Sequence, residues 1–182
     1  MTNIDRSKEP VIVVDKDDNQ IEVSPRTESE NNPAKIIRFV YVLLFNQEGQ
    51  ILIQRRHADL ERFPNYWTAS ASGAVFPEES YPQAAERKVQ DELGVSPKLF
   101  HQTRIRLGVP EKADRMTGVF VGYVDDITQI SPNEIKVSEV RWVTTEEAEK
   151  GYLLAPSFAQ LLQWWKQSEE DVKKEVKSQL ES

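Results

Sequence analysis

The stretch GAVFPEESYPQAAERKVQDELGV, residues 73–95, carries the strongest structural signal in this chain. Ser80 is suited to cap a helix, and Gln83 follows three residues later, which is the spacing of a capping box. Apolar residues then recur at every fourth position and form one helical stripe, namely Ala85, Val89 and Leu93. A glycine at position 94 favours the left-handed end of a helix. The sequence therefore predicts one helix over residues 80–93 with this stripe buried.

Charged residues occupy a second face of the same predicted helix. Positions 88, 91 and 92 lie three and four apart, so Lys88, Asp91 and Glu92 share one face. Glu79, in the preceding loop, can reach the same place. Such oxygen ligands suit Mg²⁺ or Mn²⁺, which also bind substrate phosphates. The pattern indicates a metal site in which the ammonium of Lys88 weakens metal affinity and can contact phosphate instead.

In its spacing this stretch resembles the Nudix box, with Gly73, Glu79, Arg87 and Glu92 in frame and Lys88 where the box has a glutamate. The segments FNQEGQILIQRR (45–56) and FPNYWT (63–68) extend the resemblance to the isopentenyl-diphosphate isomerase-like branch of that superfamily. The resemblance implies an α/β protein with the Nudix fold. That fold is a mixed β-sheet in an α/β/α sandwich, here with an N-terminal β-hairpin.

The resemblance also implies roles for individual residues. Arg56 and Lys88 match basic contacts to a diphosphate, and Glu92 matches a metal-binding glutamate. Together with Asp91, Glu92 would act in catalysis, while Arg87 would orient the site by pairing with Glu79. Glu134 and Glu139 lie where the family often adds a late carboxylate, and Glu134 completes the predicted metal set. A charged edge strand is the alternative for these two residues.

Two positions depart from the isomerase pattern. The isomerases have a cysteine just before position 73 and a metal-binding histidine just after it, whereas this chain has Ser72 and Ala74. There is no cysteine in the chain, and its two histidines, His57 and His101, match none of the family ligands. A serine hydroxyl is a poor acid for protonating an alkene. Isomerase activity is therefore the least favoured of the functional hypotheses.

The rest of the chain is organised around this segment. Residues 1–34 are predicted to form an N-terminal hairpin (strands 11–14 and 21–23) and a polar connector from residue 24. Residues 35–165 are the Nudix domain, with strands at 36–45, 50–54, 99–107, 118–124 and 139–143.

A polar loop at 108–117 carries two substrate-contact candidates, Lys112 and Arg115, for which solvated charge is the alternative. Helices follow at 144–149 and from Pro156, where Trp164 either covers the substrate or packs in the core. Residues 166–182 are a charged helical tail.

Composition limits the partners. The formal charge is −7 and the isoelectric point about 5.0, which argues against a nucleic-acid backbone as partner. Highly anionic ligands would need a focused basic pocket or bound cations. The chain has neither an apolar run of membrane-spanning length nor a cysteine, and we expect a cytoplasmic protein with no membrane partner. The oligomeric state stays open, with a homodimer as one alternative.

Three functions follow from these observations. The first is metal-dependent hydrolysis of a small-molecule diphosphate, either a nucleoside diphosphate or an isoprenoid-like one. The second is a Nudix domain that binds a diphosphate without turnover, as Lys88 suggests. The third is an isomerase of an isoprenoid diphosphate.

Overall fold

A computed structural model describes residues 6–182, so residues 1–5 of the predicted N-terminal segment lie outside the described range. The strands are β1 (Pro10–Val14), β2 (Gln20–Pro25), β3 (Ile36–Phe45), β4 (Ile51–Arg56), β5 (Trp67–Thr68), β6 (Ala71–Ala74), β7 (Leu99–Leu107), β8 (Asp114–Tyr123) and β9 (Val137–Val143). The helices are α1 (Arg26–Glu30), α2 (Tyr81–Leu93), α3 (Thr145–Gly151) and α4 (Pro156–Glu181), with a short 3-10 turn, η1, at Ile127–Gln129.

The strands form a mixed sheet with β3 at its centre. β3 pairs in parallel with β8 from Ile36 opposite Asp114 to Phe45 opposite Tyr123, and antiparallel with β1, β4 and β6. Alternate residues of β3 enter two separate cores. Because both faces are covered, the strand is apolar along nearly its whole length.

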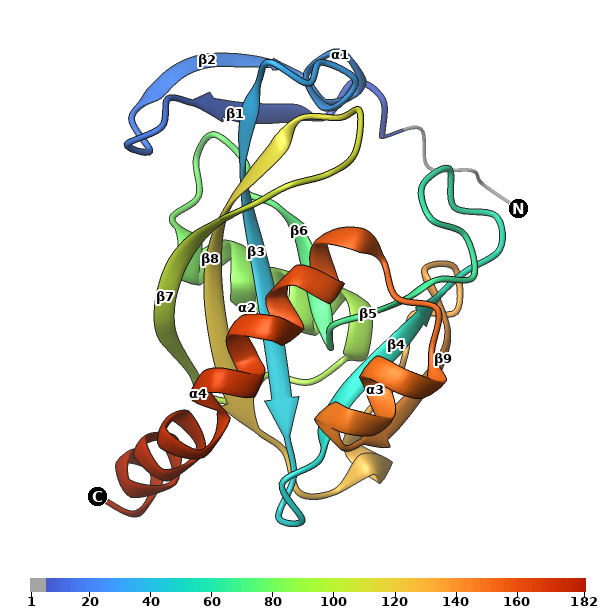
Figure 1. Cartoon of the computed structure of the whole chain (residues 1–182), viewed down its shortest axis with the longest axis vertical. Coiled ribbons are helices and arrows are strands. Elements are labelled where there is room, and N and C mark those ends of the chain that lie inside the picture. Colours follow the sequence, from blue (N-terminus) through green and yellow to red (C-terminus); the bar gives the residue numbers. More distant parts are fainter. Residues whose placement is uncertain (1–5) are drawn as a thin grey trace.

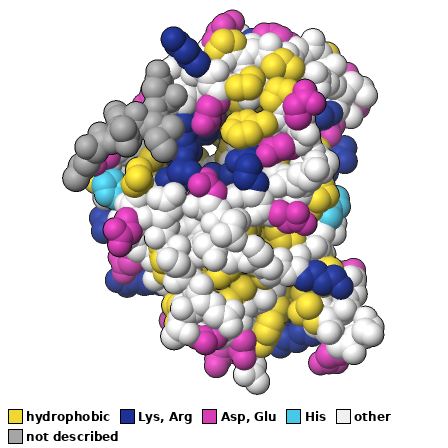
Figure 2. Space-filling model, turned by 180° about the vertical axis from the view of Figure 1, so that it is seen from behind, with side chains coloured by type: hydrophobic (Ala, Val, Ile, Leu, Met, Phe, Trp, Pro, Cys, Tyr) yellow, Lys and Arg dark blue, Asp and Glu magenta, His cyan; other side chains and the backbone are white. Residues whose placement is uncertain are grey.

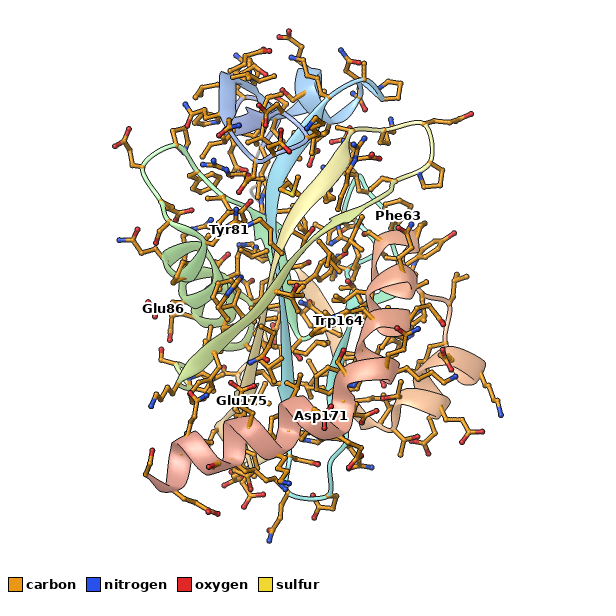
Figure 3. All side chains as sticks on the ribbon, turned by 60° about the vertical axis from the view of Figure 1, so that its left-hand side comes forward. Phe63, Tyr81, Glu86, Trp164, Asp171 and Glu175 are labelled. Atoms are coloured by element: carbon orange, nitrogen blue, oxygen red, sulfur yellow. The ribbon has the colours of Figure 1, made fainter. Side chains whose placement is uncertain are left out.

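Helices cover both faces, as Figure 1 shows. One core contains α4 residues such as Phe158, Leu161 and Trp165, and the other contains the predicted α2 stripe of Ala85, Val89 and Leu93. The predicted α/β/α sandwich and N-terminal hairpin are therefore confirmed. Trp164 is partly buried against the core on the α4 side, which corresponds to the packing alternative (Figure 3).

The predicted boundaries of α2 also hold. The Ser80 side chain accepts from the Gln83 backbone N–H, and the Gln83 side chain accepts in return from the Ser80 N–H, which completes the capping box. Gly94 ends the helix with φ 68°. These local contacts fix where the charged face of α2 begins and ends.

Two segments differ from the sequence-based expectation. The polar connector contains α1, whose last residues, Ser29 and Glu30, are buried. The loop predicted at 108–117 ends earlier because β8 begins at Asp114 and continues the parallel ladder with β3. The first two residues of this strand are charged, and they pair with residues of other elements, Asp114 with Arg106 and Arg115 with Glu30.

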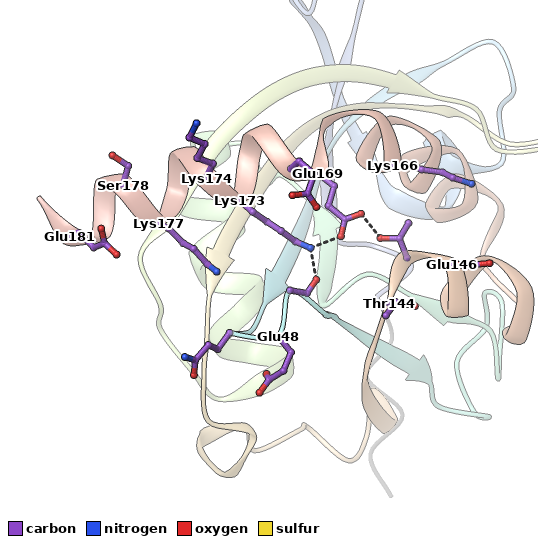
Figure 4. A pocket seen from close by; sticks show the side chains of 14 residues that line it. Glu48, Thr144, Glu146, Lys166, Glu169, Lys173, Lys174, Lys177, Ser178 and Glu181 are labelled. Atoms are coloured by element: carbon purple, nitrogen blue, oxygen red, sulfur yellow. Dashed lines mark hydrogen bonds and ion pairs between the residues drawn. The ribbon is translucent and has the colours of Figure 1, made fainter.

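The charged C-terminal segment is the second half of α4, and the predicted boundary at residue 166 falls inside this helix. Val172 and Val176 are buried, and the Lys173 ammonium donates to the Gly49 carbonyl and to Glu169 (Figure 4). An open groove of about 900 Å³ runs beside this part of α4 and contains both Lys and Glu side chains.

Within residues 6–182, no helix combines the length and the apolar character that crossing a membrane requires.

Candidate anion-binding site

A pocket of about 310 Å³ lies between α2, β4 and the N-terminal segment. Figure 2 shows Lys and Arg side chains gathered around a hollow on this face. Its wall contains three carboxylates, from Glu9, Asp91 and Glu92. It contains twice as many cationic side chains, namely Arg6, Arg26, Arg56, Arg87, Lys88 and Lys136. A positive pocket in a chain of net charge −7 is a focused site for an anion.

Lys88 lies at the centre of the α2 side of this pocket. Its side chain is buried, and its Nζ lies 2.5 Å from Glu92 Oε1 and 3.8 Å from Asp91 Oδ2. Burial lowers the pKa of Lys88, and the neighbouring charge of Glu92 opposes that shift. Lys88 and Glu92, which share one face of the predicted helix, therefore form a buried i,i+4 ion pair.

Glu92 is held from three directions. Besides Lys88, its Oε2 accepts from Gln54 Nε2 at 2.7 Å and from the Ser72 backbone N–H at 3.2 Å. Ser72, which stands where the isomerases have their cysteine, thus meets Glu92 through its backbone. These contacts fix the Glu92 carboxylate at the pocket wall.

Asp91 has a different cation. Lys136, just before β9, donates to Asp91 Oδ2, and Asn133 donates to the Asp91 carbonyl at 3.2 Å. Burial raises the pKa of Asp91, but the Lys136 hydrogen bond and the charge of Lys88 outweigh burial, so the pKa lies below its ordinary value.

Glu79 pairs with Arg87, as the sequence predicts. Arg87 Nε donates to Glu79 Oε1, and Arg87 Nη2 donates to Glu79 Oε2 at 2.9 Å and to the Ala74 carbonyl at 3.0 Å. The Phe76 backbone N–H donates to Glu79 at 3.0 Å. Both oxygens of Glu79 are therefore engaged in holding the loop between β6 and α2 against the helix.

The donor set does not fit a divalent cation in this arrangement. Three of the four predicted carboxylate ligands already have a cationic partner: Glu79 has Arg87, Asp91 has Lys136, and Glu92 has Lys88. The fourth, Glu134, is exposed in the segment before β9. Across residues 6–182, no three His, Asp or Glu side chains come together as a metal-binding group. A dication placed here would face two ammonium groups, and the repulsion between them is substantial.

Arg56, the predicted diphosphate contact on β4, lines the pocket. Its Nε donates to the Arg62 carbonyl at 2.9 Å, and no carboxylate of the described chain lies within ion-pair distance of it. Burial lowers the pKa of Arg56, and the charges of Arg26 and Arg6 lower this pKa further. The negative charge of Glu92 opposes the shift. Arg56 is thus a largely desolvated cation that faces the pocket without its own counter-ion.

The other predicted site residues lie away from this pocket. Lys112 donates to Asn31 Oδ1 at 2.7 Å, and Glu134 is exposed in the segment before β9. Glu139, on β9, pairs with Arg141. Arg115 is buried at the start of β8 with its Nη2 3.4 Å from Glu30, so it is neither a solvated loop charge nor part of the pocket wall.

Several pocket residues were not identified from the sequence, among them Gln54, Lys136 and Arg26. Gln54 offered one signal, because it is a polar residue at the end of an alternating strand. Lys136 and Arg26 offered none, since each reaches the pocket through contacts between distant parts of the chain.

Comparisons with known proteins agree with this architecture. The model of the NUDIX domain family matches residues 36–165. An uncharacterized Nudix hydrolase of Listeria innocua is 36% identical over 117 residues, which is 64% of this chain and 69% of the relative. An isopentenyl-diphosphate Delta-isomerase of Nocardia farcinica is 33% identical over 146 residues, 76% of this chain and 81% of the relative.

Solved structures share the fold. A Deinococcus radiodurans protein superposes with a TM-score of 0.71 at 23% identity, over 85% of this chain and 98% of that one. A MutT protein from Methanosarcina mazei gives a TM-score of 0.65 at 22% identity, over 75% of this chain and 96% of that one.

Proposed function

Because the chain belongs to the Nudix family, we propose that its pocket binds the diphosphate group of a small molecule, such as a nucleoside diphosphate or an isoprenoid-like diphosphate. The family typically depends on a divalent metal to handle such groups. In this chain, side-chain cations occupy the corresponding positions around the box helix.

The observation that carries this proposal is the placement of Lys88 and Lys136 beside the two helix carboxylates. Two ammonium groups supply the same total charge as one dication. An ammonium has three donors, and those that do not bind Glu92 or Asp91 are available to phosphate oxygens. Arg56 adds a guanidinium that has no carboxylate partner within the described chain. We infer that these groups bind diphosphate without added metal.

Calorimetry with inorganic pyrophosphate in a buffer containing EDTA tests this proposal. Wild type should bind, and Lys88→Gln should weaken binding about tenfold, which corresponds to losing one charged hydrogen bond. Lys177→Gln is the matched control, because it removes the same charge from an exposed site on α4. No binding by wild type in EDTA, or equal affinity for wild type and Lys88→Gln, would contradict the proposal.

A second candidate function is hydrolysis of the diphosphate bond with Mg²⁺ or Mn²⁺. The position of Glu92 at the pocket wall and the similarity to Nudix hydrolases favour it. It requires Glu79, Asp91 and Glu92 to exchange their present partners for metal.

Phosphate release from a panel of diphosphates, with and without Mg²⁺ or Mn²⁺, tests this candidate. If hydrolysis occurs at this site, Glu92→Gln should reduce its rate about tenfold or more, a loss of roughly 1.4 kcal/mol of transition-state stabilisation. An unchanged rate in this variant would remove α2 from the chemistry.

A further inference from the structure

Glu30, the last residue of α1, is a buried carboxylate surrounded by three guanidinium groups. It is 2% exposed, and it lies outside the part of the chain that matches the family model. Its Oε1 lies 3.1 Å from Arg26 Nε and 3.4 Å from Arg115 Nη2, and its Oε2 lies 2.6 Å from Arg62 Nη1. A carboxylate this deeply buried is stable only because it is paired in this way.

Two of these three arginines connect Glu30 to the pocket. Arg26 lines the pocket directly, and it also pairs with Glu9 at 3.0 Å. Arg62 acts through its backbone, because its carbonyl accepts from Arg56 Nε at 2.9 Å. Glu30 thereby fixes both Arg26 and the chain segment that orients Arg56.

The charge of the pocket is unevenly distributed. On the α2 side, three cations are matched by three carboxylates, in the pairs Arg87–Glu79, Lys88–Glu92 and Lys136–Asp91. On the other side of the pocket wall, the cations Arg6, Arg26 and Arg56 outnumber the carboxylate of Glu9 by three to one.

This excess of positive charge is largely desolvated. Burial lowers the pKa of Arg56 in this wall. Behind the wall, burial lowers the pKa of Arg115 to about 10, and the Arg115 Nη1 has no hydrogen-bond partner among the described residues. Charge buried without a partner is costly, so a wall of this kind is suited to an anion from solution. The uncompensated charge of the pocket therefore lies opposite α2.

We propose that Glu30 is a positioning residue that holds Arg26 and Arg56 in this wall for the anionic group of the ligand. The inference rests on the proposed diphosphate binding and extends the site to the N-terminal segment. Glu30 itself is negative and would repel the ligand, so its contribution is geometric.

Removing the Glu30 charge should therefore change ligand affinity in opposite directions under the two explanations. If Glu30 acted only through its charge, Glu30→Gln would strengthen pyrophosphate binding, because a negative charge is removed near the pocket. If Glu30 positions the two arginines, Glu30→Gln should weaken binding about tenfold in calorimetry, the equivalent of one charged hydrogen bond. Glu30→Asp keeps the charge but shortens the side chain, and it should also weaken binding. Glu28→Gln, an exposed change on the same helix, is the control.

A double-mutant cycle separates positioning from general structural damage. In an Arg56→Gln background, Glu30→Asp should weaken binding less than it does in the wild type, because one of the two groups that it positions is already gone. Damage to the fold would instead weaken binding equally in both backgrounds. Circular dichroism checks folding, and Arg62→Lys, which keeps the charge but shortens the reach to Glu30, gives the same test if the Glu30 variants do not fold.

The outcomes also distinguish the two proposals. Failure of wild type to bind pyrophosphate contradicts the proposed function. Binding by wild type that is unchanged or stronger in the Glu30 variants overturns the positioning role alone.

Discussion

At the scale of single residues, the position of the Lys88 side chain depends on the absence of a side chain at Gly73. A Cβ added at Gly73 would lie 2.6 Å from both Cδ and Cε of Lys88, closer than any normal contact between carbon atoms. The glycine therefore provides the space in which the Lys88 stem reaches the pocket. Because the stem is buried, it has little freedom to move aside without displacing the ammonium from Glu92.

We expect Gly73→Ala to weaken pyrophosphate binding about tenfold, since it displaces one charged donor. Calorimetry with folded protein measures this effect. Gly151→Ala is the control, because a methyl group there meets nothing within 4 Å beyond its own turn of α3. Wild-type affinity in the Gly73 variant would mean that Lys88 adapts without cost.

At the scale of elements, the ion pair between Glu79 and Arg87 holds the loop after β6 against α2. The Arg87 guanidinium also lies over the Phe76 ring, with its central carbon 4.2 Å from the ring centre. Burial raises the pKa of Glu79, but the hydrogen bonds from Arg87 and the Phe76 backbone outweigh burial and leave the pKa below its ordinary value of 4.5.

This shift gives the loop a defined pH dependence. Because the folded-state pKa is lowered, the pair stabilises the fold fully above pH 4.5, and this contribution is lost as pH falls through the folded pKa. We expect Glu79→Gln to lower the melting temperature at pH 7 and to reduce its decline between about pH 5 and 3. Thermal melting across this range measures the effect, with the exposed neighbour Glu78→Gln as control. Parallel curves for wild type and Glu79→Gln would contradict this role.

At the scale of the whole molecule, Asp18 joins the N-terminal hairpin to the sandwich. It lies in the β1–β2 turn with φ 67°, and its carboxylate is 2.8 Å from both Arg38 Nε and Arg104 Nη1. The Tyr81 hydroxyl at the start of α2 donates to it at 3.0 Å. Burial raises the pKa of Tyr81, and Asp18 raises it further, so the tyrosine stays protonated as the donor.

Asp18→Asn keeps a residue type that tolerates positive φ but removes the charge that unites these partners. We expect a loss of about 1–3 kcal/mol in the free energy of unfolding and faster amide exchange in β1 and β2. Denaturant unfolding and hydrogen exchange measure these effects. Asp17→Asn, an exposed change in the same turn, should have little effect. Equal losses of stability in the two variants would indicate that the turn itself stabilises the hairpin, and that the contacts of Asp18 with Arg38, Arg104 and Tyr81 do not.

The sequence by itself determined the elements whose signals are local. Its capping box, four-residue apolar spacing and terminal glycine specify α2, and the apolar run at 36–45 predicts the strand β3. The family resemblance predicted the pair of Glu79 with Arg87, and helix spacing placed Lys88 and Glu92 on one face, where they form an ion pair. Such signals act over a few residues, so they can be read along the chain.

Only the tertiary structure decided which charges from distant segments lie together. The parallel pairing of β3 with β8 buries Arg115 next to Glu30, and the segment before β9 brings Lys136 to Asp91. Arg115, predicted from the sequence to be a loop residue that contacts substrate or is solvated, is a buried cation for this reason. The partner of a buried charge depends on which strands and helices pack together, and no local pattern encodes that choice.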